Sequence, residues 1–348
     1  MDLVETLPTV IGTAAIAPAL LLLWLVIAAQ ERPGPPFQIW VAFLLSAASV
    51  LVLGKIRAPF ALFMNAPVPP VLAPALHAVF GAAVPEELLK VMVILLVCTR
   101  RRTFEDPMDR VVLGAAVGLG FAAYENLAYL VQYAEIWRSV AAVRGVLTVP
   151  FHGALGIIAG AYLTIAASGN ALGAHRLARL QARLWHGALM LLVPVTLHAA
   201  FDYPLLSLRQ FPDIDETHKI WLSAGSLAIG AGAMLFAAYL VLRVARHHAP
   251  RTEIGRERLS RLRRMWALLV AGGGAGLAGL AFVLTTLRQW LVEPTSDVAL
   301  LLMPIGLVSV LLGTALLGFT IGVYFFGRSR IRAHMPRSAR ARIRLRRP

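Results

Sequence analysis

Charged residues are scarce in this 348-residue chain: only 15% are Asp, Glu, Lys or Arg, while 58% are hydrophobic. With a mean hydropathy of +0.72, this composition excludes a soluble globular domain and indicates a multi-spanning membrane protein. Cysteine is scarcer still, and the single Cys98 excludes an internal disulfide framework and a cysteine metal cluster. The first residues, Met-Asp-Leu-Val-Glu, lack the basic charge of a cleavable signal peptide, so the first apolar stretch is expected to be a membrane span.

The apolar runs predict an all-α fold, a polytopic transmembrane bundle of about nine helices. The predicted spans are residues 9–30, 37–54, 73–99, 111–131, 146–168, 186–208, 220–242, 266–287 and 300–326. Prolines are too frequent between Pro59 and Pro74 for a straight span, so this stretch predicts an interfacial or re-entrant approach to the third helix. We expect N-terminal spans with this segment (1–72), a four-helix core (73–208), three C-terminal spans (209–327) and a basic tail (328–348).

Basic residues are shared unevenly between the two ends of these spans. The loops and tail on one side hold 25 Arg, and those on the other side hold 7 Arg or Lys. Because basic loops stay in the cytoplasm, nine spans place the N-terminus outside and the C-terminus inside, in the plasma (inner) membrane. The net charge of +15 therefore reflects topology, and no nucleic-acid partner is expected. The basic loops and tail are expected to contact anionic lipid.

Ionisable side chains inside spans are the exception in this chain, and each costs about 2.5–3.5 kcal/mol on insertion. Four predicted helices carry them or a neighbouring amide: Glu86, Glu87 and Lys90; Glu125 and Asn126; His152; His198 and Asp202. A helix rises about 1.5 Å per residue, which places one such group of each helix roughly 9–10 Å below the outer surface. His198 lies one turn deeper. We therefore expect carboxylates and imidazoles to share one layer in the outer half of the membrane, around a water-accessible cavity open to the outer side.

Structural roles compete with this interpretation. Glu86 and Lys90 share a helix face at i and i+4, and either Glu86 or Glu87 could form a buried ion pair with Lys90 that only joins helices. His198 and Asp202 have the same spacing, and Asn126 is more typical of helix–helix contacts than of chemistry. The common depth of four helices favours a shared site.

At these residues the chain resembles the PrsW family of intramembrane proteases, distant relatives of the CAAX-processing and bacteriocin-immunity membrane proteases. The motifs are Pro85-Glu86-Glu87-Leu88-Leu89-Lys90, Gly120-Phe121-Ala122-Ala123-Tyr124-Glu125-Asn126, Pro150-Phe151-His152-Gly153 and His198-Ala199-Ala200-Phe201-Asp202. They span residues 75–205 in the order of the family. The CAAX branch has a His where Glu125 stands, so it fits less well. The resemblance implies a peptidase that cuts a membrane-anchored protein, such as an anti-sigma factor, outside the membrane.

Two mechanisms remain open for these residues. Glu86 or Glu87 is the candidate base that activates water, with Lys90 tuning the carboxylate. His152 and His198, with Glu86 or Asp202, could hold zinc or another divalent metal; alternatively, they could hold water and the oxyanion without a metal.

A proton- or cation-coupled transporter would use the same kinds of residue as a relay. It predicts inverted repeats, and the polar groups instead cluster in the third to sixth predicted helices.

Overall fold

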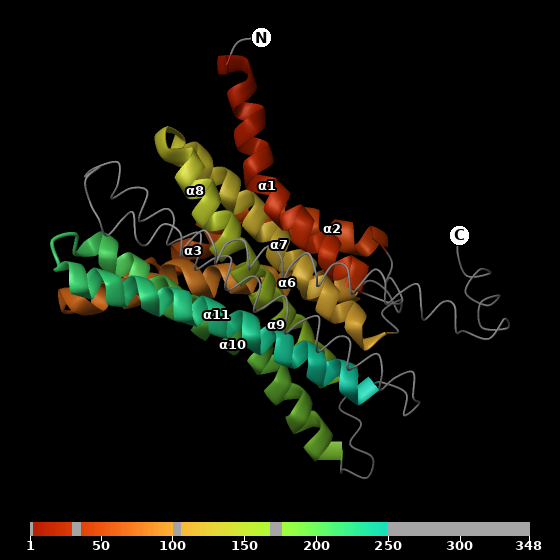
Figure 1. Ribbon diagram of the computed structural model, residues 1–348. Helices are drawn as coiled ribbons and strands as arrows, with labels where there is room; N and C mark the ends of the chain where they lie inside the picture. Colours follow the sequence, from red (N-terminus) through yellow and green to blue (C-terminus); the bar gives the residue numbers. More distant parts are fainter. Residues whose placement is uncertain (1–2, 30–35, 100–105, 168–175, 249–348) are drawn as a thin grey trace, which may run out of the picture. The chain divides into compact units, whose positions relative to one another are not determined.

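The structure, a computed structural model, describes residues 3–29, 36–99, 106–167 and 176–248, which belong to one compact unit (Figure 1). Within these ranges the chain is helical and contains no strand. The helices are α1 (Leu3–Ala29), α2 (Pro36–Ser49), α3 (Leu53–Arg57), α4 (Ala61–Met64), α5 (Ala73–Leu76), α6 (Val84–Thr99), α7 (Pro107–Gln132), α8 (Trp137–Val143), α9 (Val149–Ala167), α10 (Arg176–Gln210) and α11 (Glu216–His248). The prediction of an all-helical membrane fold is confirmed.

Six stretches of the described chain are long and apolar enough to cross a membrane. They are Pro8–Ile27, Pro36–Met64, Pro107–Gln132, Ala134–Ala167, Leu180–Gln210 and Glu216–Val244. The predicted span 73–99 is also helical, but it carries three Glu or Lys residues and is not among the six. The predicted spans 266–287 and 300–326 and the basic tail lie outside the described residues. The count of nine spans and the orientation of the termini stay predictions.

The proline-rich stretch before α5 is less irregular than the sequence suggests. Pro59 lies in the first turn of a 3-10 segment, Ala58–Phe60, where a missing N–H costs no hydrogen bond. The helical path therefore continues through α4 to Met64. Only residues 66–69 have no regular structure before the 3-10 turn Pro70–Leu72 leads into α5.

Helix α7 has a well-defined start. Asp106 is its N-cap and accepts a hydrogen bond from the Met108 N–H at 2.9 Å, while Asp109 accepts one from the Asp106 N–H at 3.3 Å. This reciprocal capping, with Pro107 in the first turn, satisfies backbone donors that the helix cannot pair internally. The cap fixes where α7 begins and hence which residues reach its far end.

Glycines allow α7 to pack unusually close to α9. A Cβ at Gly114 would lie 2.1 Å from the carbonyl oxygen of Gly156, and one at Gly118 would lie 2.1 Å from that of His152. Small residues at membrane helix interfaces permit this backbone approach. As a result, most residues of α7 are buried, and the end of α7 that carries Glu125 is held against the start of α9.

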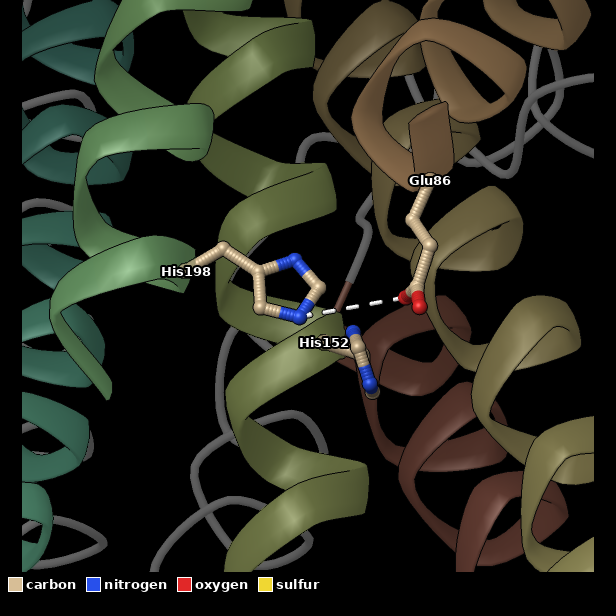
Figure 2. Close-up of side chains that lie close together, drawn as sticks. All are labelled: Glu86, His152 and His198. Carbon is tan, nitrogen blue, oxygen red and sulfur yellow. Dashed lines mark ion pairs between the residues drawn. The ribbon is translucent and has the colours of Figure 1, made fainter. Parts of the chain in front are cut away.

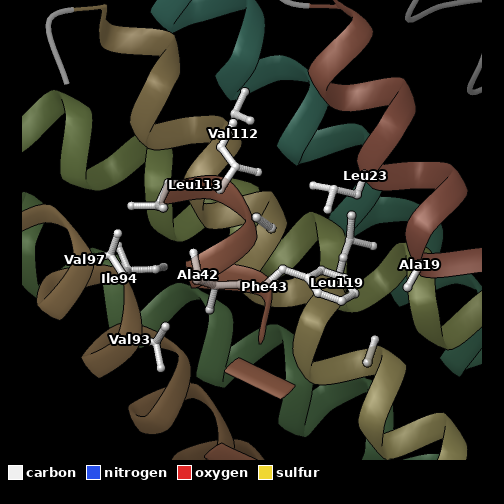
Figure 3. Close-up of a cluster of buried hydrophobic side chains, with 14 of the residues drawn as sticks. Ala19, Leu23, Ala42, Phe43, Val93, Ile94, Val97, Val112, Leu113 and Leu119 are labelled. Carbon is white, nitrogen blue, oxygen red and sulfur yellow. The ribbon is translucent and has the colours of Figure 1, made fainter. Parts of the chain in front are cut away.

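The apolar core surrounds α7. Side chains of α1, α2, α6 and α7 interlock there, as Figure 3 shows for Leu23, Phe43, Ile94 and Leu119. Helices α10 and α11 pack against each other and against α9. The four helices that carry the polar residues, α6, α7, α9 and α10, are therefore held in place by the packing of their apolar faces.

Candidate active site

The polar residues of four helices meet in one place. Helix α6 contributes three of them, α7 two, α9 one and α10 two: Glu86, Glu87, Lys90, Glu125, Asn126, His152, His198 and Asp202. Figure 2 shows the Glu86 carboxylate and the rings of His152 and His198 close together. Most of the set is buried, but the side chains of Glu125 and Asp202 keep 17% and 22% of their surface exposed. These two carboxylates therefore mark the least buried side of the cluster.

Glu87 and Lys90 are both almost fully buried. Lys90 Nζ donates to Glu87 Oε1 at 2.6 Å and lies 2.9 Å from His152 Nδ1. The ammonium also sits 4.3 Å from the ring centre of Phe121, a favourable cation–π contact. The sequence left open whether Glu86, on the same helix face, or Glu87 pairs with Lys90, and in the structure the i,i+3 neighbour Glu87 is the partner. Both spacings bring side chains together on a helix, so spacing alone does not distinguish them.

Lys90 also determines the proton position on His152. A lysine ammonium only donates hydrogen bonds, so His152 Nδ1 must accept. The ring proton then lies on Nε2, which donates to Glu125 Oε2 at 2.9 Å. Both ring nitrogens of His152 thus have a charged partner.

His198 is oriented differently. Its Nδ1 lies 2.8 Å from Glu87 Oε1, and because an ionised carboxylate only accepts, Nδ1 carries the proton. In the neutral ring, Nε2 then has a free lone pair. This nitrogen faces Asp202 Oδ2 at 3.3 Å and Glu86 Oε2 at 3.8 Å. Glu87 therefore fixes the proton on Nδ1, which leaves Nε2 available as a base or a metal ligand whenever the ring is neutral. The carboxylates of Asp202 and Glu86 favour a second proton on this nitrogen, so Nε2 can also donate.

Two arginines outside the predicted spans reach the site. Arg144 Nη2 lies 2.9 Å from Glu125 Oε2, and Arg57 Nη2 lies 3.8 Å from Glu86 Oε1. Both belong to the side of the protein that has few basic residues, and this placement is the sequence signal that sets them apart.

Arg144 is held by one face of α7. Its Nε donates to Asn126 Oδ1 at 2.9 Å, and its guanidinium stacks 3.8 Å from the ring centre of Tyr129. Asn126 also donates to the Ala15 carbonyl at 3.5 Å, so it joins α1 to α7 as expected for a helix–helix contact. Arg144 and Asn126 together hold Glu125 against His152.

Local irregularities precede two of the site residues. A π-helical segment, His77–Ala83, ends three residues before Glu86, and a second, Arg144–Thr148, ends four residues before His152. Such segments are frequent at functional sites because they shift the register of the following side chains. In α10, Pro194 and Pro204 lie on either side of His198 and Asp202.

One carboxylate and both imidazoles are grouped as a metal centre requires. Glu86, His152 and His198 each offer one ligand atom, and these atoms lie within 4.8 Å of one another. Glu86 Oε2 is buried and has no hydrogen-bond donor among the described residues, which suits a bound cation. Two imidazoles and a carboxylate are a known zinc ligand set. A metal on His152 would replace Lys90 or Glu125 at one ring nitrogen.

The family model and the relatives that match this chain name the same protease family. A family model described as PrsW family intramembrane metalloprotease matches residues 34–215. Protease PrsW of Bacillus subtilis (strain 168) is 34% identical over 126 residues, 36% of this chain and 52% of the relative. Protease PrsW of Geobacillus kaustophilus is 33% identical over 137 residues, 39% and 55% of the two chains.

A third relative, Protease PrsW of Oceanobacillus iheyensis, is 31% identical over 151 residues, 43% of this chain and 66% of its own length. The matches thus cover about half to two thirds of these curated relatives. No solved structure matches the chain. The family match spans more than half of the chain and includes every residue of the cluster, so the chain belongs to the PrsW family of intramembrane metalloproteases.

Proposed function

We propose that this protein is an intramembrane endopeptidase that hydrolyses a peptide bond of a membrane-anchored protein near the outer side of the plasma membrane. The observation that carries the proposal is the convergence of three glutamates and two histidines, Glu86, Glu87, Glu125, His152 and His198, in one buried cluster. An anti-sigma factor is the first substrate class to test. The predicted orientation places the cluster in the outer half of the membrane, which suits a cut outside the membrane.

Glu87, Lys90 and Glu125 position the two histidines. Glu87 holds the proton of His198 on Nδ1, and Glu125 accepts the proton that His152 carries on Nε2. Lys90 neutralises Glu87, whose burial without a cation would be costly. These contacts keep the rings facing Glu86 before a substrate arrives, which is the preorganisation that catalysis needs.

Glu86 has one carboxylate oxygen without a hydrogen-bond partner among the described residues. Its Oε2 accepts no hydrogen bond from the described residues and lies 3.8 Å from His198 Nε2. We assign it one of two roles: a ligand of zinc or another divalent metal together with His152 and His198, or the carboxylate that takes the proton of the attacking water. When bound, such a metal would polarise the scissile carbonyl and make water more acidic. Asp202, at the exposed edge, can hold His198 Nε2 or join the ligand set.

Hydrolysis needs two proton transfers by these groups. A carboxylate takes a proton from water as the water oxygen bonds to the carbonyl carbon, and the carbonyl π electrons move to the carbonyl oxygen. The electron pair on that oxygen then re-forms the C=O bond, the C–N bond breaks, and the amine nitrogen receives the proton that the carboxylic acid holds. The burial of the cluster keeps bulk water away from its hydrogen bonds.

The test uses the full chain in liposomes with a reporter made of one transmembrane span and an external fluorescent domain. The span and flanking residues come from a candidate anti-sigma factor. We expect release of the external domain and its loss in the His198→Ala variant. Metal analysis of the same preparations distinguishes the two roles of Glu86: a ligand role predicts lower metal content in Glu86→Gln, and a base role predicts lost activity with unchanged metal content. Absence of release from every anchored reporter would refute the proposal.

A further inference from the structure

Three cationic side chains lie against the carboxylates of the cluster in the described part of the chain, and they differ in how their donors are used. They are Arg57, Lys90 and Arg144. Peptide hydrolysis places a negative charge on the carbonyl oxygen, and a donor that stabilises it must be free to reach the substrate. The hydrogen bonds and ion pairs that each cation already makes therefore show which one is free to bind the substrate oxygen.

Lys90 is not available for this role. Its ammonium is 1% exposed, donates to Glu87 and contacts His152 and the face of Phe121. Moving it toward a substrate would leave Glu87 as a buried carboxylate without its cation, which is costly.

Arg144 is not available either. Its side chain is 13% exposed, and Glu125, Asn126 and Tyr129 hold it from one face of α7. Its buried Nη2 lies 2.9 Å from Glu125 Oε2 as an ion pair without hydrogen-bond geometry, so Arg144 is held by charge at this atom and by a hydrogen bond at Nε. Release of this guanidinium would also free Glu125, the partner of His152. Arg144 is therefore a positioning residue.

Arg57 has donors to spare. Its only ion pair among the described residues is to Glu86 at 3.8 Å, longer than a hydrogen bond, and its buried Nε has no hydrogen-bond partner there. The side chain is 40% exposed, against 6% for Glu86. It extends from α3, which packs beside α6 and the π-helical segment before it. Arg57 is thus a partly exposed cation beside the carboxylate with the free oxygen.

We propose that Arg57 binds the carbonyl oxygen of the scissile peptide bond and stabilises its negative charge in the transition state. A planar guanidinium with several N–H donors suits an oxyanion. Arg57 keeps its proton throughout: it donates a hydrogen bond when the π electrons move to the oxygen and is released when the C–N bond breaks. This inference rests on the proposed function, since it assigns a residue to the same reaction.

The test compares Arg57→Gln with Lys55→Gln, a matched control because Lys55 is an exposed cation two residues away on α3. Removal of one oxyanion donor typically lowers kcat by about 10²–10³-fold. We expect Arg57→Gln to lower kcat by about that factor with little change in KM, and Lys55→Gln to change neither. Arg57→Lys keeps the positive charge but loses the planar guanidinium with its paired N–H donors, so it should recover part of the rate.

Binding of a phosphinic peptide, a tetrahedral analogue of the transition state with an anionic oxygen, gives a second readout. Arg57→Gln should weaken it by the same factor as kcat while leaving the affinity for the uncleaved peptide unchanged. Equal kcat in the two Gln variants, or a loss confined to KM, would overturn the assignment. Cleavage by the wild-type protein is measured in parallel, so failure of the proposed function appears separately, as an inactive wild type.

Discussion

Gly118→Ala tests whether the close approach of α7 and α9 builds the site. A Cβ at this position would lie 2.1 Å from the carbonyl oxygen of His152 and 3.3 Å from the Gly153 Cα. Carbon and carbonyl oxygen atoms normally stay about 3.3 Å or more apart, so the two backbones must separate by about 1.2 Å. The obstacle is backbone, which cannot rotate away as a side chain can.

The same shift reaches the chemistry. The hydrogen bond from His152 Nε2 to Glu125 Oε2 is 2.9 Å long, and an added 1.2 Å along it would break it. A misplacement of about 1 Å can cost about 10²-fold in rate, and overpacking costs about 1–3 kcal/mol of stability. We therefore expect Gly118→Ala to lower cleavage by about two orders of magnitude and to lower the unfolding temperature.

The assay is release of the external domain from the anchored reporter in liposomes, with thermal unfolding measured on the same protein. Gly232→Ala is the matched control, since a Cβ at Gly232 in α11 meets nothing within 4 Å. Equal activity of the two variants would refute the reasoning that glycine packing places His152 against Glu125.

Three further predictions follow from the contacts and the charge pattern. Lys90→Met should lower the free energy of unfolding by about 3–5 kcal/mol because it leaves a buried carboxylate without its cation. The control Lys219→Met removes the exposed i,i+3 pair with Glu216 and should cost less than about 1 kcal/mol. Equal losses of stability in thermal unfolding would contradict this prediction. Arg144→Gln should lower kcat by about 10–100-fold by freeing Glu125. The guanidinium of Arg138 contacts Trp137 instead, so Arg138→Gln should retain activity. Comparable rates for the two variants would show that Arg144 does not position Glu125. Reporter fusions should place residues 176–183 in the cytoplasm and residues 213–216 outside, and the reverse result would overturn the predicted orientation.

The sequence predicted which helices carry the site because depth along a helix is a local property. A fixed rise per residue placed Glu86, Glu125 and His152 at one level, and the structure brings these residues together. Partners were harder to predict, since Glu86 and Glu87 both lie within reach of Lys90 along α6. The packing of α6 against α10 determines which glutamate pairs with Lys90, because Glu87 also accepts a hydrogen bond from His198.

The arginines could not be assigned from local spacing. Arg57 ends α3 and Arg144 begins the π-helical segment before α9; both lie just outside the predicted spans, where the sequence pattern indicates only topology. Their contacts with Glu86 and Glu125 depend on how α3 and the segment before α9 pack on the core. The fold was predictable as a helical membrane bundle, while the break points at the π-helical segments left no clear periodic signal.

The most direct test of the account is the rate at which Glu86→Gln and Glu87→Gln release the external domain of the anchored reporter. Gln keeps the size and most of the hydrogen bonding of Glu but removes the basic carboxylate, and general-base catalysis contributes about 10²–10⁴-fold. The account predicts a loss of this size in Glu86→Gln, and a loss in Glu87→Gln because the tautomer of His198 is no longer fixed. Full activity of both variants at unchanged protein levels would contradict the account and favour a cation-coupled transporter instead.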